Sequence, residues 1–490
     1  MINYTKSKLV TILLVAVVVA IAWSCSDDDE GGIQPPEITS NDLQVEAGRG
    51  TDAQVALSLN APSGIQSLSV TADGGAPEDI PVNTGSTTQN VTYDFSIPAS
   101  SVYGDQYPLV FTLMDQGNQS TTVNATVTTG KLMETPATYE FTREGASTVF
   151  YGGQTDRLNM VEEIKEVLRA GDAGGTVSEQ VLLDMYANTG GNGGGNFSFT
   201  SDRQLKDKTF TPDLDHNFFE NFFAGAAAAS VNGNNGVTAS NGTAGLITRE
   251  NSGNTILVDE KGREFTQLIE KGFMGSVFYH QIFNVYLSDE RIGDEVENTE
   301  LVEGENYTAM EHHLDEAFGY WDPPLDFTSP WPDERGDEDR FWSHYSNTVD
   351  NVSNGLLGTN ETIMNAFKEA RAAIVNNDLN TKNQMRDVLY EQLELVAAAV
   401  CVHYINGTLS SLGEGNTGEA FHTLSEAWAF ANALKYSPHK AITLEQLEQI
   451  METDFGTDGN FWNVTPAGLN AAKATLVSVY PALVPLQDDL

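Results

Sequence analysis

The chain has few cysteines and few basic residues. Only Cys25 and Cys401 occur among its 490 residues, so the sequence offers neither a cysteine zinc cluster nor a redox pair. Lys and Arg number 25 against 69 Asp and Glu, which gives a formal net charge of −44. A surface of this charge repels phosphates and anionic lipids, and it therefore argues against nucleic acid as a partner.

Several catalytic signatures are also missing. The sequence contains no His-Glu-x-x-His zinc-protease helix, no Walker loop and no Gly-x-Ser-x-Gly nucleophile elbow. Residues 332–339 and 454–460 are rich in oxygen-bearing side chains but lack the spacing of a calcium-binding EF-hand. We interpret both segments as solvated loops.

The amino-terminal residues predict export. Lys6 and Lys8 precede an apolar run over residues 9–22, which is short for a membrane span. Ala22-Trp23-Ser24 then resembles a lipobox, after which a cysteine is lipidated. We predict a signal peptide over residues 1–24 and a lipid anchor on Cys25, which ties the protein to a membrane. The alternative is an uncleaved amino-terminal anchor.

An acidic tether is predicted over residues 25–36. Ser26-Asp27-Asp28-Asp29-Glu30 resembles the serine-plus-acidic segment with which Bacteroidetes lipoproteins reach the outer leaflet of the outer membrane. We therefore expect a lipid-anchored protein exposed on the cell surface, with the periplasmic face as the alternative. A plain solvated spacer would have the same composition.

Residues 37–130 alternate apolar and polar side chains, which is typical of strands with one buried face. The alternation is clear at 91–97, 109–113 and 123–127, and Asp115-Gln-Gly-Asn118 between the last two favours a hairpin turn. We predict a small antiparallel, immunoglobulin-like β-sandwich that serves as a spacer.

The period changes to that of helices over residues 137–490. Residues 154–170 place Leu158, Val161, Ile164 and Leu168 on one face, and Gly171 marks the end of that helix. Further helices are expected at 177–188, 260–287, 361–375, 381–410, 419–434, 444–453 and 466–480. Gly- and Asn-rich segments at 189–196 and 230–245 predict exposed loops. The predicted fold is an all-α domain of one or two packed bundles, with Cys401 buried in it.

One motif on this domain indicates chemistry. Thr308 and Glu311 form a capping box, which predicts a helix start just before the histidines. His312 and His313 then stand four and three residues before Glu316, so all three side chains share one helical face. An imidazole and a carboxylate placed in this way can share one cation.

A metal site needs ligands from a second helix. His422 and Glu426 are four residues apart on such a helix, and we hypothesise that they converge with His313 and Glu316 on a divalent metal ion. The weaker candidate ligands are His312, Asp315 and His403. Two alternatives need no ligand, since such clusters also complement helix ends and tie helices together in buried polar networks.

The helical region contains the segments Glu311-His-His-Leu-Asp-Glu-Ala-Phe-Gly-Tyr320, Phe341-Trp-Ser-His-Tyr345 and Ser425-Glu-Ala-Trp-Ala-Phe430. In these segments it resembles a family of uncharacterised Bacteroidetes lipoproteins, domain of unknown function 4856, that is akin to imelysins. The resemblance implies two helical bundles, a His-x-x-Glu motif matched by His313 and Glu316, and a link to iron acquisition. Imelysins commonly have a glycine shortly before this histidine, where Glu311 and His312 stand here.

These observations lead to one expected function and two alternatives. We expect a surface lipoprotein that binds a metal ion, iron in the first place, or a metal-bearing ligand, and passes it to an outer-membrane transport receptor. A metal-dependent hydrolase or peptidase is the enzymatic alternative. A non-catalytic scaffold of a surface complex is the structural one.

Overall fold

The computed structural model of this protein describes residues 34–211, 214–332, 335 and 338–490. The predicted signal peptide, the lipidation site Cys25 and the tether up to residue 33 lie outside the described residues. The chain divides into two compact units. Of the described residues, the first contains 34–43, 55–93 and 108–125, and the second contains 44–54, 94–107 and those from 126 onward.

The amino-terminal region consists of two β-sheets. A three-stranded sheet has the order β1-β3-β6, and a five-stranded sheet has the order β2-β8-β7-β4-β5. Their bounds are β1 Glu37–Thr39, β2 Gln44–Gly48, β3 Asp52–Asn60, β4 Ile65–Ala72, β5 Glu78–Ile80, β6 Thr88–Ser96, β7 Gln106–Asp115 and β8 Ser120–Gly130. The expected β-region is confirmed.

Alternation and turn chemistry account for these strands. In β3, every second residue is buried, because strand side chains point to opposite faces of a sheet. The predicted turn joins β7 to β8: the backbone N–H of Gln119 donates to Asp115 Oδ1 at 2.8 Å, and Asn118 adopts a φ of 60°. One detail differs from the antiparallel prediction, since β2 pairs with β8 in parallel. The chain leaves the first sheet after β1 and enters the second at its edge, where no hairpin sets the strand direction.

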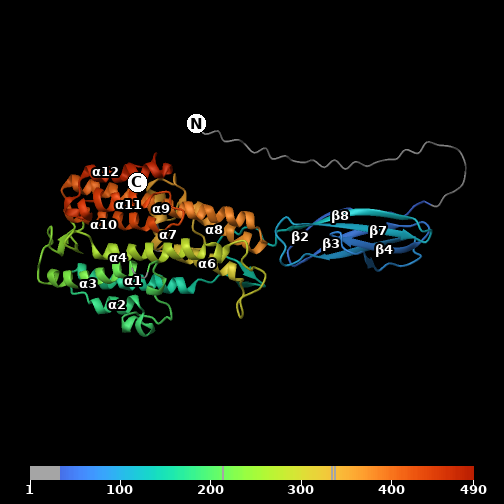
Figure 1. Cartoon of the computed structure of the whole chain (residues 1–490), viewed down its shortest axis with the longest axis horizontal. Coiled ribbons are helices and arrows are strands. Elements are labelled where there is room, and N and C mark those ends of the chain that lie inside the picture. The colour runs from blue at the N-terminus through green and yellow to red at the C-terminus, as the bar shows by residue number, and fades with distance from the viewer. Residues whose placement is uncertain (1–33, 212–213, 333–334, 336–337) are drawn as a thin grey trace. The chain divides into compact units, whose positions relative to one another are not determined.

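The rest of the chain is mostly helical, as predicted. The helices are α1 Gly152–Asp172, α2 Glu179–Tyr186, α3 Asp215–Asn234, α4 Phe265–Phe273, α5 Asp289–Ile292, α6 Ala309–Trp321, α7 Phe341–Val352, α8 Thr359–Asn376, α9 Leu379–Glu414, α10 Thr417–Ala433, α11 Leu444–Gln449 and α12 Pro466–Val479. In Figure 1, α4 runs between α1 on one side and α10 on the other. A short hairpin of β11 (Gly245–Thr248) and β12 (Thr255–Val258) precedes α4.

One continuous hydrophobic core, from Tyr139 to Leu490, holds the helical body together. Leu158, Val161 and Ile164 of α1 are buried in it, which confirms the predicted apolar face. Cys401 is buried and free, as expected, and burial raises the pKa of its thiol. Among the described helices, α9 has the length and apolar composition to cross a membrane, and 56% of its most apolar window is buried inside the body.

The predicted helix over residues 260–287 contains a change of helix type. After α4 it continues as two π-helical segments, η4 (Met274–Tyr279) and η5 (Gln281–Tyr286). The wider π-turn rotates the side chains that follow it, and such turns are frequent at functional sites. The second π-helical segment, η5, packs along α6, and this contact places Tyr286 beside that helix.

Two expected loops are shorter or more ordered than their composition predicted. Helix α3 extends to Asn234, so the predicted loop at 230–245 begins inside a helix, where Ser230 is fully buried. Within 189–196, two 3₁₀ turns form around Asn188, whose side chain accepts the Gly193 N–H at 2.9 Å and donates to the Ser201 carbonyl at 2.8 Å. Side-chain hydrogen bonds therefore order a segment that glycine content alone marks as irregular.

Candidate functional site

Helix α6 begins where the capping box predicted. Thr308 Oγ1 accepts the backbone N–H of Glu311 at 3.3 Å, and the Glu311 carboxylate accepts the N–H of Thr308 at 2.8 Å. These bonds satisfy two donors that a helix start otherwise leaves free. Because the helix begins at this point, the side chains of His312, His313 and Glu316 project from one face of its first turns.

Two imidazoles approach one carboxylate oxygen on this helix. His313 Nδ1 lies 3.3 Å from Glu316 Oε2, and His312 Nε2 lies 3.8 Å from the same oxygen. The side chains of His312, His313 and Glu316 are 22%, 17% and 17% exposed, so solvent reaches all three. We call these three residues the α6 cluster.

Side chains from two other elements orient the cluster. Gln154 of α1 donates to Glu316 Oε1 at 3.0 Å and contacts the Tyr286 hydroxyl at 3.3 Å. The aromatic ring of Tyr307 stacks on His312, with 4.6 Å between the ring centres. One oxygen of Glu316 is thus held by an amide, which leaves the other to face the imidazoles.

The electrostatics of the cluster favour an ionised acid beside a neutral imidazole. Burial by itself raises the pKa of Glu316, but the hydrogen bonds from His313 and Gln154 and the field of His312 outweigh it, and the pKa is lowered. Burial lowers the pKa of His312 against the opposing pull of Glu316. These are the protonation states in which both groups bind metal ions.

Asp315, a weaker predicted ligand, points away from the cluster. It accepts hydrogen bonds from Arg371 Nε at 3.0 Å and from the Tyr139 hydroxyl at 2.8 Å. Asp315 and Arg371 are both fully buried, and Arg371 also lies 3.2 Å from Glu311. Asp315 therefore belongs to an internal ion network that joins α6 to α8.

The second predicted pair lines a different feature, a cleft of about 810 Å³ that we call the central cleft. Its lining includes Asp172, Glu264, Lys271, Asp339, His422 and Glu426. His422 Nδ1 lies 2.7 Å from Glu264, and Glu426 lies 3.2 Å from the Lys271 ammonium. His403, which is on α9, interacts electrostatically with Glu426 of α10. Burial lowers the pKa of the His403 imidazole.

The structure does not bring the two pairs together. Among the described residues, no hydrogen bond or ion pair joins His313 or Glu316 to His422 or Glu426. In that part of the chain, no group of three or more His, Cys, Asp or Glu side chains is already arranged to hold a metal ion. Glu316 of the first pair instead accepts a hydrogen bond from Gln154, and His422 of the second pair contacts Glu264.

Comparison with known proteins assigns a family to the helical body. The model of the family described as "Domain of unknown function (DUF4856)" matches residues 136–480, which is most of the chain. The chain belongs to this family. No curated protein matches the sequence of this chain. One solved structure, titled as a polysaccharide lyase, is similar at 8% identity with a TM-score of 0.14, and the match covers 81% of this chain and 58% of that one.

Three functional candidates in this DUF4856 domain were missed by sequence reasoning. Glu264 contacts His422 but is 158 residues away from it in the sequence. Asp172 stands at the end of α1, and its carboxylate accepts hydrogen bonds from the Leu257 N–H and the Thr266 hydroxyl. Lys271 lies in an apolar helix, where a lone cation marks a buried ion pair. Of these signals, only the last could have been recognised in the sequence.

Asp172 predicts a pH effect on the stability of the DUF4856 domain. Burial and the nearby Glu264 raise the pKa of its carboxyl to about 7. Folding therefore binds a proton here, so this contribution to stability is complete below the ordinary pKa of 3.8 and is lost as pH rises through about 7. We expect Asp172→Asn, which cannot ionise, to lose less stability than the unaltered protein between pH 4 and 8. Urea unfolding at a series of pH values measures the difference, and parallel curves would contradict the assignment.

Proposed function

We propose that this protein is an exported, lipid-anchored binding protein whose helical body holds a metal ion or a metal-bearing ligand at the α6 cluster. The observation that supports this most is the approach of His312 and His313 to the same oxygen of Glu316, at 3.8 and 3.3 Å. Two imidazoles and one carboxylate with positions left open are the ligand set typical of non-haem iron(II). Iron is therefore the favoured ion.

The surroundings of the cluster fit this role. Metal-ligating side chains are commonly oriented by a second set of hydrogen bonds, and Gln154 supplies one to Glu316 at 3.0 Å. A bound ion would replace the imidazole–carboxylate contacts, with small rotations of the two partly exposed rings. The net charge of −44 attracts cations to the body from the surrounding solution.

The resemblance to imelysins supports the same proposal from another direction. His313 and Glu316 match the His-x-x-Glu motif of that family, which is linked to iron acquisition. With a lipid on Cys25, the protein would present this site at the outer membrane, where a transport receptor could take the ion over. Three protein ligands also leave room for a metal-bound water, so a metal-dependent hydrolase remains the alternative outcome of the tests.

The proposal predicts a loss of metal affinity in one of two matched double variants. We expect His313→Ala with Glu316→Ala to weaken iron(II) binding by at least about 100-fold, because loss of even an outer partner of a metal ligand costs 10–100-fold. His422→Ala with Glu426→Ala, an equivalent change in the central cleft, should leave the affinity unchanged. Anaerobic titration calorimetry with iron(II) measures both.

Two results would overturn or redirect the proposal. The absence of saturable iron(II), manganese(II) or zinc(II) binding by the unaltered protein, together with no metal in natively purified material, removes it. Equal affinity in the first double variant and the unaltered protein removes the α6 cluster as the site. Peptide cleavage that a chelator abolishes and metal restores would make the bound ion catalytic.

A further inference from the structure

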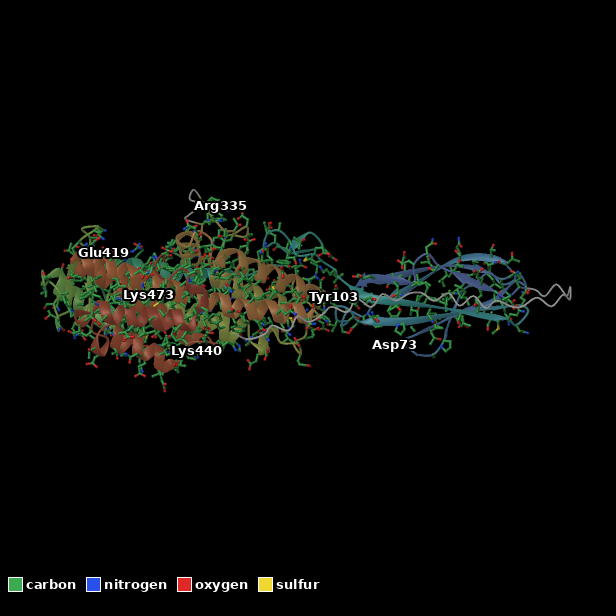
Figure 2. The ribbon with its side chains drawn as sticks, turned by 90° about the horizontal axis from the view of Figure 1, so that it is seen from above. Asp73, Tyr103, Arg335, Glu419, Lys440 and Lys473 are labelled. Carbon is green, nitrogen blue, oxygen red and sulfur yellow. The ribbon has the colours of Figure 1, made fainter. Side chains whose placement is uncertain are left out.

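The central cleft is a second candidate site, separate from the α6 cluster. Its walls come from α1, α4, α7 and α10, and its volume of about 810 Å³ lies in the range of small-molecule sites. None of the three α6 cluster residues lines it. Figure 2 labels Glu419 in the helical body; its side chain is 10% exposed and pairs with the lining residue Arg249 at 2.7 Å.

Most charges in the cleft already have partners of opposite sign. The Lys271 ammonium lies 2.7 Å from Glu270 and 3.2 Å from Glu426. Lys165 lies 2.9 Å from Glu270. The lining arginines bind carboxylates beside the cleft, Arg169 with Glu166, Arg249 with Glu419, and Arg340 with Asp322. An anionic ligand would have to compete with these carboxylates for every cation.

Asp339 differs from the other lining carboxylates, since even Asp172, which has no ion pair, accepts hydrogen bonds from the Leu257 N–H and the Thr266 hydroxyl. The Asp339 side chain is 0% exposed, and within the described residues neither of its carboxylate oxygens has a hydrogen-bond partner. The nearest basic group is the His344 imidazole, whose Nδ1 lies 3.8 Å from Oδ2. A buried carboxylate without donors is costly, because neither water nor protein replaces its lost hydration. Two strong acceptors in the cleft wall therefore need a donor from elsewhere.

The residues that directly follow Asp339 are held in place by neighbouring side chains. Arg340, the next residue, is fixed by Asp322 at 2.7 Å and by Asn159 at 2.9 Å. Phe341 then adopts a φ of 48°, a left-handed conformation that a bulky side chain rarely takes. Strain of this kind is kept where the surrounding structure over-determines a position, and it clusters at ligand sites. The His344 side chain, which also lines the cleft, is 53% exposed.

We propose that the central cleft binds a ligand through a primary ammonium group that pairs with Asp339. An ammonium carries three donors and a positive charge, so it can satisfy both oxygens of the carboxylate at once. A bare metal ion would need several more oxygen ligands, and the neighbouring carboxylates are committed to Lys271 and Lys165. The remaining polar wall, including His422, would contact the uncharged part of the ligand.

Two sources of a primary ammonium can be distinguished by experiment. The probes are triglycine, which carries the amino end of a peptide, and a glucosamine trimer, which carries sugar amines. The matched controls are N-acetyl-triglycine and the N-acetylglucosamine trimer, in which the amine is a neutral amide. Titration calorimetry uses the full chain at about 0.15 M salt, where the Debye length of about 8 Å screens diffuse attraction to the acidic surface.

We expect saturable binding of one amine probe and at least a tenfold weaker signal from its acetylated control. Asp339→Asn should weaken the same probe at least tenfold, whereas Asp387→Asn, a change in the separate apolar cavity of about 620 Å³, should not. Equal binding of the amine and its acetylated control overturns the proposal, as does the absence of saturable binding by both amines. The acetylation comparison needs no variant, so it decides the matter even if Asp339→Asn does not fold. Titrations with iron(II) test the α6 cluster, so failure of the amine probes in the central cleft does not bear on the proposed metal site.

Discussion

Replacing Arg371 with alanine is expected to lower the free energy of unfolding of the helical body by about 3–5 kcal/mol. The guanidinium is fully buried, and it lies 3.0 Å from Asp315 and 3.2 Å from Glu311, both of which are also fully buried. Its removal leaves the buried Asp315 carboxylate without a compensating charge, whereas Glu311 keeps its ion pair with Arg143 at 2.8 Å. It also removes a hydrogen bond of 3.0 Å to the Thr148 hydroxyl. Urea unfolding followed by circular dichroism measures the loss.

A surface arginine provides the control. Arg169 pairs with Glu166 at 2.7 Å, but these two side chains are 56% and 63% exposed. Exposed pairs of this kind contribute about 0–1 kcal/mol, so Arg169→Ala should change little. Equal losses in the two variants would show that the buried network does not hold α6 to α8. In that case the α6 cluster would have to be positioned by apolar packing alone.

Replacing Trp342 with alanine is expected to cost about 3–5 kcal/mol, the range found for large buried aromatic residues. The indole of this α7 residue is fully buried and stacks on Tyr279, with 3.6 Å between ring centres and 7° between planes. Its N–H donates to the Met274 carbonyl at 2.9 Å, at the start of the π-helical segment. The variant loses both this packing and the side-chain hydrogen bond to the Met274 carbonyl.

Trp342→Phe separates the two contributions. A phenyl ring can keep most of the stacking on Tyr279 but cannot donate to Met274, so the expected loss is about 1–3 kcal/mol. Chemical denaturation of both variants measures the difference. A loss in Trp342→Phe as large as in Trp342→Ala would mean that the hydrogen bond to the π-segment dominates. No loss in either variant would contradict the role of Trp342 as a packing anchor.

Helices with a single polar face were predictable, whereas α3, α7 and the four-residue α5 were missed. Helix α1 shows the regular spacing of Leu158, Val161 and Ile164, and its bounds follow from that period. Helix α3 carries aromatic residues on more than one side, with Phe218 and Phe222 partly buried and Phe219 and Phe223 buried, so it shows no clear stripe. Helix α7 is short, and eight of its twelve residues are buried. Periodicity identifies a helix by a single apolar stripe, which α3 lacks and which is harder to recognise in a helix as short as α7.

The candidate site was predictable only over one helical turn. The contact between His313 and Glu316 follows from helix geometry, which brings residues three apart onto one face. The meeting of this pair with His422 and Glu426 depends on how distant helices pack, which the spacing of residues does not encode. In the structure, His422 Nδ1 lies 2.7 Å from the Glu264 carboxylate, and the Lys271 ammonium lies 3.2 Å from the Glu426 carboxylate. His422 and Glu426 therefore contact charged side chains of α4 and of the residue before it, rather than the first pair.

The uninterrupted apolar interior from Tyr139 to Leu490 has a practical consequence. Because one core contains the helices of both sites, a molecule that binds at either site to the folded form, and not to the unfolded chain, raises the temperature at which this body unfolds. Ions at α6 and amines in the central cleft would thus register in the same melting curve. A single thermal screen of metals and amines, with the variants above to localise each response, can survey both places at once.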